Sequence, residues 1–597
     1  MKLPRWAAIG TSVVLFLLAF FLRAYRPISR PDQWLARSWI FCSALGRHDW
    51  AATYQSRHPG FTTMVISGTT LCLYDEAAGT PLQNLFTWGV FPFATDMGRE
   101  MAIGVLGLSI VLSALIVAIA LAIRKLAGWP MALAAAGLMA FAPAYLAESR
   151  VLHVDALVST LMLLSALLLL VSLQAKQRRY LVLSGVVGGL ALLTKTPALF
   201  LLPYTGLALL VYLLCNLRNG WRDHAKGWMG WLLGETWRGL VFPLLLWVVM
   251  VALPFAFWPA MWVNPTTVLG NMMTGTLEHV VNPHVYPRFF NGHIYTGAAP
   301  GPLFYPTILA FNASFITFVL FLVSLVYYVL RRRNTGHLLP PITFWLLVAY
   351  VAFFTIQMTI GAKQSDRYEM PAQLMLEVLA AAGLAAVADL VQRALADLKL
   401  RLAQAVVPIL LAAAIGLQAL VALAFMPDYG AHYNYLFGGN QGAVHVVEFT
   451  GQNEGIAYLG DYMSHVAGER LPSLAVSYPL NTSIRQYYAG ETFYPIPHDA
   501  DYYAFNLVTL QRQMGDAAWW AAWERFAGAS PQMVVSFDGV DYLWLYAANP
   551  GPRDYEMVIR RGWAGFTGIA WGVTFAFLGV FIWALRRTKG ETAEKVV

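Results

Sequence analysis

Long apolar runs separated by short polar and basic connections dominate the chain. Twelve of these runs approach the length of about 20 residues that an α-helix needs to cross a bilayer: 6–22, 101–123, 130–147, 156–173, 181–194, 197–215, 239–257, 307–330, 341–359, 370–390, 405–425 and 564–585. The pattern predicts a membrane all-α multi-pass bundle of about 12 transmembrane helices. Lys195 and Pro197 interrupt the stretch 181–215, so a single kinked span is an alternative to two helices there.

The positions of lysine and arginine predict the orientation of this bundle. Basic residues of membrane proteins are retained in the cytoplasmic connections. With the N-terminus inside, every short inner connection is basic, as at Arg124-Lys125 and Arg331-Arg332-Arg333. The positive flank Met1–Arg5 precedes the first run, and no small-residue cleavage site follows it, so we expect an uncleaved first helix. We therefore predict an integral protein of the plasma (cytoplasmic or inner) membrane with both termini in the cytoplasm.

Two outer loops, 23–100 and 258–306, and a tail are left on the outer side. Apolar pieces of the first loop, Trp34–Leu45 and Phe61–Leu73, are too short to span and predict helices at the membrane interface.

The tail 426–562 has the pattern of a small soluble domain. Four short β-type runs occur in it, the last two joined by the turn Asp538-Gly539: Leu474–Tyr478, Tyr502–Leu507, Val534–Phe537 and Tyr542–Tyr546. Gly455–His465 and Ala517–Phe526 have the pattern of helices. We expect a transmembrane module 1–425 with the two outer loops, an exterior α/β domain 426–562, and a last transmembrane helix with a cytoplasmic tail, 563–597.

Composition excludes a water-soluble protein. Of 597 residues, 58% are hydrophobic and 12% charged, whereas soluble domains carry about a quarter charged residues. The net charge of +8 comes from short clusters without a basic stripe and interleaved aromatics, so we expect no nucleic acid partner. Cys42, Cys72 and Cys215 are too few and too scattered for a metal cage or a disulfide scaffold, and a Cys42–Cys72 bridge is the minor alternative.

Ionisable residues at the outer helix ends are the functional candidates, because a transmembrane chain uses such residues sparingly. Four clusters fall on the outer side: Arg30-Pro31-Asp32-Gln33 with His58-Pro59-Gly60; Glu148-Ser149-Arg150 with His153 and Asp155; Thr194-Lys195-Thr196; and Lys363-Gln364-Ser365-Asp366-Arg367-Tyr368. Together they would line an outward-facing cavity with carboxylates and a ring of positive groups. Such a set fits a reaction in which an anion leaves and a hydroxyl or amine loses a proton.

Each of these residues also has a purely structural interpretation. Asp32 follows a proline and fits a turn, and Asp155 fits the cap of the helix that starts at residue 156. Lys195 and Arg367 could extend to lipid headgroups, and an isolated histidine such as His58 is more often structural. A further acid, Glu377, could be hydrogen-bonded in the bundle or face a cavity.

The order of these motifs resembles that of the membrane glycosyltransferases of the C superfamily (GT-C), in the branch of protein O-mannosyltransferases and lipid A aminoarabinose transferases. The resemblance covers about residues 5–390 and is clearest in Ser184–Pro203 and Lys363–Pro371. It includes an acid in the first outer loop, His-Pro-Gly at the end of that loop, Arg-x-x-x-x-Asp before the fourth helix, and Asp-Arg-Tyr-x-x-Pro at the tenth.

The resemblance implies a sugar donor on a polyprenyl or dolichyl monophosphate and an acceptor bound on the outer face. By motif, Asp32 would be the base or orienting group for the acceptor nucleophile and Asp155 the second catalytic carboxylate. His58, Arg150, Lys195, Lys363 and Arg367 would lie near the donor phosphate, where fixed cations stabilise the leaving group. Direct displacement would invert the anomeric centre.

The residue after the first-loop acid differs from the family pattern. Relatives commonly have Glu there, whereas this chain has Gln33, which removes a charge and weakens both a paired-carboxylate mechanism and a metal site. Because there is also no Asp-x-Asp signature, we expect a metal-independent reaction and no cofactor.

Two other classes of protein stay open from the sequence. Twelve helices also suit a transporter or glycolipid flippase, although the two halves show no repeat of the kind such proteins have. Gln33 keeps a non-catalytic glycolipid-binding protein possible. The sequence does not identify the sugar, or whether the acceptor is a protein, a lipid or a glycan; we expect the tail domain to help select it.

Overall fold

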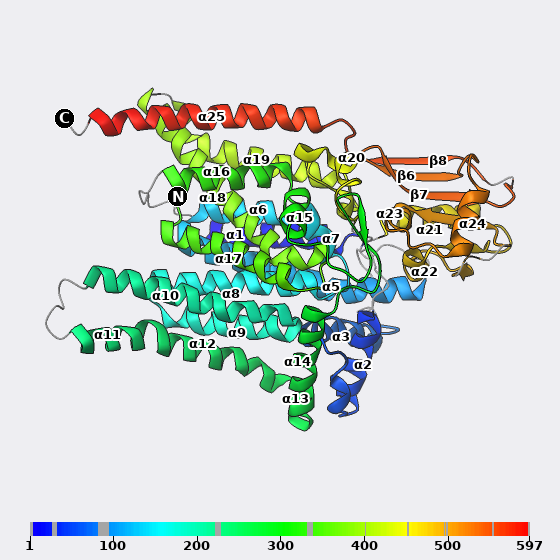
Figure 1. The fold of residues 1–597 in the computed structure, drawn as a ribbon, viewed down its shortest axis with the longest axis horizontal. Coiled ribbons are helices and arrows are strands. Elements are labelled where there is room, and N and C mark those ends of the chain that lie inside the picture. The colour runs from blue at the N-terminus through cyan, green and yellow to red at the C-terminus, as the bar shows by residue number, and fades with distance from the viewer. Residues whose placement is uncertain are drawn as a thin grey trace.

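Figure 1 shows the computed structural model, in which long helices form a bundle with a small sheet at one end. The structure describes residues 4–26, 33–80, 95–220, 228–330, 338–399, 401–449, 453–494, 496, 499–551 and 554–594. Helix α1 begins, and helix α25 ends, toward the end of the bundle away from the sheet. The predicted class, a multi-pass helical bundle with a small sheet domain near the C-terminus, is confirmed.

Each of the twelve apolar runs forms a helix or a broken helix. The bundle consists of α1 (Arg5–Ala24), α5 (Asp96–Ala127), α6 (Trp129–Ala140), α7 (Pro143–Ser149), α8 (Asp155–Ala175), α9 (Arg178–Thr194), α10 (Leu201–Gly220), α11 (Trp228–Thr236), α12 (Phe242–Ala252), α15 (Phe304–Asn312), α16 (Phe315–Leu330), α17 (Pro341–Ile360), α18 (Met370–Asp397), α19 (Val406–Leu423) and α25 (Thr567–Glu594). A π-helical turn, Trp237–Val241, connects α11 to α12.

Nine helices within the described residues are long and apolar enough to cross a membrane, or up to eleven if each of two bent pairs is one span. The bent pairs are α6 with α7, at 62°, and α15 with α16, at 115°. Helix α9, with 17 residues, is too short to be among them. Its shortness accounts for the difference from the twelve spans predicted.

The stretch 181–215 forms two helices rather than one kinked span. Lys195 has extended backbone angles (φ −159°, ψ 140°) and ends α9. A 3₁₀ turn, Thr196–Phe200, then leads into α10. Because Pro197 cannot continue the helical hydrogen bonding, the break places Lys195 at the end of α9.

Helices α8 and α18 form the centre of the bundle. In each, 89% of the most apolar window is buried, compared with 17% for α1 and 11% for the span that contains α12. Charged residues lie at the start of α8 and directly before α18: Asp155 opens α8, and the 3₁₀ turn η5 (Asp366–Glu369) precedes α18. The two best-buried helices therefore bring charged residues to one end of the core.

Within its described residues, the first outer loop contains two short α-helices, α2 (Trp34–Gly46) and α3 (Phe61–Glu76), as its apolar pieces predicted. A disulfide between Cys42 and Cys72 joins them, so the minor alternative of the sequence interpretation is the one observed. The two cysteines become neighbours only because α2 and α3 pack as a hairpin. The second outer loop contains α13 (Ala260–Val263), α14 (Pro265–Val281) and a small ribbon of β1 (Arg288–Phe290) and β2 (His293–Tyr295).

The tail contains a six-stranded mixed sheet in the order β4-β3-β5-β7-β6-β8. Its strands are β3 (Leu474–Val476), β4 (Thr492–Phe493), β5 (Tyr502–Asn506), β6 (Met533–Phe537), β7 (Val540–Ala547) and β8 (Met557–Arg561), and its helices are α20 (Gly439–Ala443), α21 (Ile456–Val466), α22 (Tyr478–Ile484), α23 (Leu507–Arg512) and α24 (Ala517–Arg525). Asp538 (φ 49°) and Gly539 (φ 80°) form the predicted β6–β7 hairpin turn. The edge strands β4 and β8 were not predicted. The domain limits at 426 and 562 stay predictions.

Candidate active site

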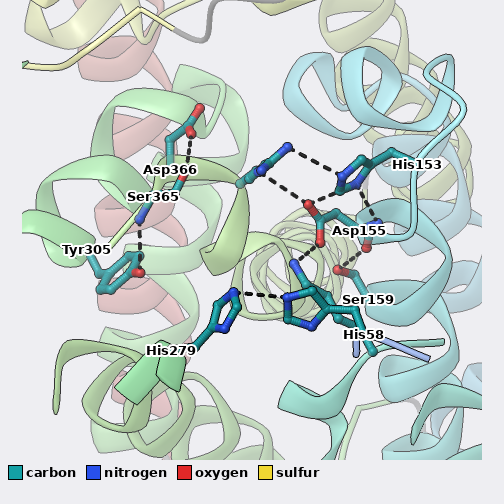
Figure 2. Close-up of polar contacts among 10 residues, drawn as sticks. His58, His153, Asp155, Ser159, His279, Tyr305, Ser365 and Asp366 are labelled. Carbon is teal, nitrogen blue, oxygen red and sulfur yellow. Dashed lines mark hydrogen bonds and ion pairs between the residues drawn. The ribbon is translucent and has the colours of Figure 1, made fainter. Parts of the chain in front are cut away.

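A buried carboxylate, Asp155, is the centre of a charge cluster (Figure 2). Its side chain is 2% exposed. Its Oδ1 lies 2.5 Å from Lys195 Nζ, and its Oδ2 lies 3.1 Å from His153 Nδ1 and 3.5 Å from Arg367 Nε. We call these four residues, together with Tyr368, the Asp155 cluster.

The Asp155 cluster is assembled from helix ends that are far apart in the sequence. Asp155 opens α8, Lys195 follows α9, and Arg367 lies in the turn η5 before α18. The ring of Tyr368 lies 4.3 Å from Lys195 Nζ and 5.6 Å from the Arg367 guanidinium carbon. An aromatic face stabilises such cations without neutralising them.

His153 connects the carboxylate to the guanidinium. Its Nε2 lies 3.5 Å from Arg367 Nη1, on the side opposite the nitrogen that faces Asp155. The Asp155 backbone amide donates to His153 Nδ1 at 3.3 Å, so this nitrogen faces both the amide and the carboxylate of Asp155. One carboxylate thus faces two permanent cations, which leaves the cluster net positive and suited to an anionic ligand.

Lys363 and a histidine pair lie next to this cluster. His58 Nε2 and His279 Nε2 are 2.9 Å apart, and Figure 2 shows the pair beside Asp155. Burial, together with the charges of Lys195 and Lys363, lowers the pKa of His58 from 6.5 to about 3. His58 is therefore a neutral hydrogen-bonding group, whereas the sequence interpretation treated it as one of the fixed cations.

The histidine pair also holds α14 over the start of α3. Arg57 and Glu278, the neighbours of the two histidines, form an exposed ion pair of 2.6 Å. On the other side, the Gly60 amide donates to the Thr194 carbonyl at 3.1 Å, which connects the first outer loop to the end of α9. These contacts bring the His-Pro-Gly segment to Lys195.

The second outer loop supports the corner that carries Lys363 and Arg367. The Gly301 amide donates to Gln364 Oε1 at 3.2 Å, and the Ser365 amide donates to the Tyr305 hydroxyl at 3.3 Å (Figure 2). The loop 290–306 therefore supports the segment 363–367 through these hydrogen bonds, a role that its sequence did not predict.

The structure brings five of the seven predicted site residues together: His58, Asp155, Lys195, Lys363 and Arg367. Asp32 lies outside the described residues. Arg150 is the exception, because its guanidinium faces a different set of groups.

Arg150 is fully buried among backbone carbonyls. It donates to the carbonyl oxygens of Pro427, Tyr25 and Arg26, and its guanidinium carbon lies 5.0 Å from the centre of the Tyr429 ring. Burial lowers its pKa from the ordinary arginine value. With these acceptors, Arg150 joins the end of α1 to the start of the tail instead of standing with Lys195 and Arg367.

Three residues of the site were not among those predicted: His153, His279 and Tyr368. His153 and Tyr368 stand within the quoted motifs, so their positions gave a signal that was not used. His279 gave none, because its contact with His58 spans 221 residues and depends on how α14 folds back.

Glu377 is hydrogen-bonded within the bundle rather than facing this site. It accepts a hydrogen bond of 2.8 Å from Thr317 Oγ1. Ser314 Oγ lies 3.1 Å from that threonine hydroxyl and 2.5 Å from Gln418 Oε1. Across the ranges that the structure describes, no group of three or more His, Cys, Asp or Glu side chains is arranged to hold a metal ion.

A family model described as dolichyl-phosphate-mannose-protein mannosyltransferase matches residues 80–247. The matched segment contains Asp155 and Lys195. The match confirms the resemblance of this segment to the protein mannosyltransferases. Comparison with curated proteins gave no match.

Several solved structures are similar to the chain at low sequence identity. The crystal structure of ArnT from Cupriavidus metallidurans bound to undecaprenyl phosphate is 14% identical, covers 92% of this chain and 100% of its own, and has a TM-score of 0.47. The apo oligosaccharyltransferase of Archaeoglobus fulgidus is 13% identical, with coverage of 85% and 70% and a TM-score of 0.45. AglB from the same organism, in complex with an inhibitory peptide and a dolichol-phosphate, has the same identity and coverage and a TM-score of 0.44.

Proposed function

We propose that this protein transfers a sugar from a polyprenyl- or dolichyl-monophosphate donor to an acceptor on the outer face of the plasma membrane, with inversion at the anomeric carbon. The observation that carries the proposal is the convergence of Lys195 and Arg367 on one buried carboxylate at the ends of the two central helices. The family model matched by residues 80–247 describes a transferase whose donor is a sugar on a lipid monophosphate, which supports the same chemistry.

In the proposed reaction, the bond between the anomeric carbon and the phosphate oxygen breaks, and the lipid phosphate leaves with the electron pair. A bond forms between the anomeric carbon and the acceptor nucleophile, whose proton passes to a base. Lys195, Arg367 and Lys363 are the groups that stabilise the charge developing on the phosphate. Neutral His58 contributes by donating a hydrogen bond.

Asp155 is better suited to positioning than to proton transfer. Its two oxygens already face Lys195, His153 and Arg367, and such pairing stabilises the ionised form of a carboxylate and weakens it as a base. We therefore assign it the task of holding the two cations in place. Asp32 keeps its sequence-based assignment as the base or orienting group for the acceptor.

The proposed orientation places the site, the first outer loop and the sheet outside. The basic inner connections support it, and so does the disulfide between α2 and α3, because such bonds persist in oxidising compartments. Both chain ends would then be cytoplasmic. We propose that the tail domain, at the same end as the site, helps to select a protein, lipid or glycan acceptor (Figure 1).

The test is sugar transfer by the purified full chain in liposomes. Radiolabelled polyprenyl-phosphate mannose and polyprenyl-phosphate glucose serve as donors, with membrane extracts as the acceptor source. We expect transfer by the wild type and strongly reduced transfer by Asp32→Asn and Lys195→Met, while Lys176→Met, an exposed lysine at the other end of α8, is the matched control. Transfer should persist after chelation of divalent metals.

Three results would count against the proposal. No transfer from any donor, together with passage of labelled lipid across the liposome, would favour a flippase. Donor binding without transfer would favour a glycolipid-binding protein. Wild-type transfer by Asp32→Asn would remove the assignment of that residue.

A further inference from the structure

A small pocket shares Arg367 with the Asp155 cluster. Its polar lining consists of Glu148, Asn312, Asp366, Arg367 and His432. The space that the centre of a water molecule can reach is about 20 Å³, which suits one water or one hydroxyl group. Because Arg367 lines the pocket and also faces Asp155, whatever occupies the pocket lies next to the proposed phosphate site.

His432 is the group in this pocket whose hydrogen bonding is incomplete. Its side chain is 3% exposed, yet neither ring nitrogen has a hydrogen-bond partner on another residue. Burial lowers its pKa from 6.5 to about 3, so the ring is neutral and offers one donor and one acceptor. Buried polar atoms are nearly always hydrogen-bonded in folded proteins, so a histidine like this indicates a ligand or a bound water.

The surroundings hold the ring firmly in this position. The rings of Phe425 and Tyr435 pack edge-on against it, at centroid distances of 5.5 and 5.9 Å. Two residues further on, the Asn434 amide donates to the Phe311 carbonyl at 2.7 Å, and its side chain donates to the Ala310 carbonyl at 2.9 Å. The tail segment is thus fastened to the end of α15, beside Asn312.

The charges around the pocket define the kind of group that it accepts. Glu148 and Asp366 disfavour an anion there, and the guanidinium of Arg367 disfavours a cation. Glu148 lies close enough to Arg367 for the two charges to interact. A neutral group that both donates and accepts, such as a hydroxyl, matches the imidazole, the amide and the carboxylates together.

We propose that this pocket binds one hydroxyl group of the sugar that is transferred, with His432 as a specificity-determining residue. The inference rests on the proposed function. In an in-line displacement the acceptor approaches the anomeric carbon from the side opposite the leaving phosphate. A pocket that shares Arg367 with the phosphate site therefore faces the donor sugar rather than the acceptor.

The experiment compares donors that lack single hydroxyl groups. The probes are the polyprenyl-phosphate hexose that the full chain transfers in liposomes and its 2-, 3-, 4- and 6-deoxy versions. The proteins are the wild type, His432→Phe, His432→Gln and, as a matched control, His465→Phe, an exposed histidine of the same domain. The measurements are kcat and KM for each donor, with thermal unfolding of each variant to verify folding.

With the wild type, we expect one deoxy donor to be used about tenfold less well than the parent, the usual effect of losing a hydrogen bond to a neutral group. His432→Phe should use the parent donor about tenfold less well and should no longer distinguish it from that deoxy donor. His432→Gln, which keeps a donor and an acceptor, should recover part of the difference. The other deoxy donors and His465→Phe should behave as the parent and the wild type do.

The outcomes separate this inference from the proposed function. If the wild type transfers sugar and His432→Phe and His432→Gln discriminate among the deoxy donors as the wild type does, the pocket does not bind a sugar hydroxyl. The transferase assignment then stays intact. The same result together with altered acceptor preference assigns the pocket to the acceptor instead. Absence of transfer by the wild type from every donor overturns the proposed function and this inference with it.

Discussion

Arg150 and Arg367 both lie at helix ends of the bundle, Arg150 after α7 and Arg367 in the turn before α18, yet their surroundings differ. Arg150 donates to three backbone carbonyls, those of Tyr25, Arg26 and Pro427. Arg367 faces side chains instead, with Asp155 Oδ2 3.5 Å from its Nε and His153 Nε2 3.5 Å from its Nη1. Its side chain is 27% exposed, whereas Arg150 is fully buried.

The comparison shows what distinguishes a structural guanidinium from one that can bind a ligand. Backbone carbonyls fix Arg150 at the junction of α1 and the tail and occupy both of its terminal nitrogens. The distances from Arg367 to Asp155 and to His153 are long for hydrogen bonds. The N–H groups of Arg367 are therefore able to bind a ligand. The four predictions below test this difference, in order of decreasing effect.

Lys195→Met should have the largest effect, because it removes the cation closest to Asp155. We expect the rate of sugar transfer to fall roughly 10²–10³-fold, as when a single charge-stabilising group is removed from an active site. The measurement is the initial rate in liposomes, normalised to folded protein. Lys195→Arg should recover part of the rate because the positive charge is kept. A rate close to wild type for Lys195→Met would exclude Lys195 from the phosphate site.

Arg367→Gln should lower transfer by about 10²-fold with little change in thermal stability. The reason is that its interactions with Asp155 and His153 are long and partly solvated. Initial rates and thermal unfolding, measured on the same preparation, test both parts. Loss of folding in this variant would show that Arg367 is structural, as Arg150 is.

Arg150→Gln should show the reverse behaviour. Losing the guanidinium leaves the carbonyls of Tyr25, Arg26 and Pro427 without their donor, so we expect a loss of about 2–3 kcal/mol in the free energy of unfolding. The rate per folded molecule should stay near wild type. Thermal unfolding and initial rates again measure the two quantities. A stable variant with a large loss of rate would return Arg150 to the phosphate site.

The contrast also shows how far the sequence predicted the molecule. Apolar run length predicted the bundle helices other than α11, because the bilayer sets that length. In the tail, β-type runs predicted β3, β5, β6 and β7, whereas the two-residue strand β4 and the exposed edge strand β8 carry too weak a pattern.

The candidate site was predictable only where it lies on helix ends. Asp155, Lys195 and Arg367 follow or open central helices, so the motifs placed them on the same side. Nothing in the sequence shows that Arg150 meets backbone carbonyls, because carbonyls carry no residue-type signature. His279 and His432 belong to an outer loop and to the tail, and their positions depend on long-range folding.

The smallest predicted effect is on pH dependence, and it separates the two arginine neighbourhoods again. Beside Lys195, His58 has its pKa lowered to about 3, so it stays neutral in the folded protein while the unfolded chain binds a proton below its ordinary value of 6.5. The titration of His58 therefore lowers the free energy of unfolding as the pH falls from about 6.5 toward 3. Beside Arg150, burial raises the pKa of Asp428 from 3.8 to about 7. The titration of Asp428 therefore raises the free energy of unfolding as the pH falls between those two values.

Thermal unfolding between pH 7 and pH 5 should resolve the two contributions. His58→Gln should lose less stability than wild type on acidification, by about 1–2 kcal/mol at pH 5, since one pKa unit corresponds to about 1.4 kcal/mol. Asp428→Asn should lose more than wild type over the same range, because it lacks a carboxyl that takes up a proton on folding. His465→Gln, at an exposed position, is the control and should follow the wild type.

Parallel curves for His58→Gln and wild type would mean that His58 is solvated and is not buried beside Lys195. If His58→Gln and Asp428→Asn changed the pH dependence of stability in the same direction, the prediction that His58 and Asp428 act in opposite directions would be wrong.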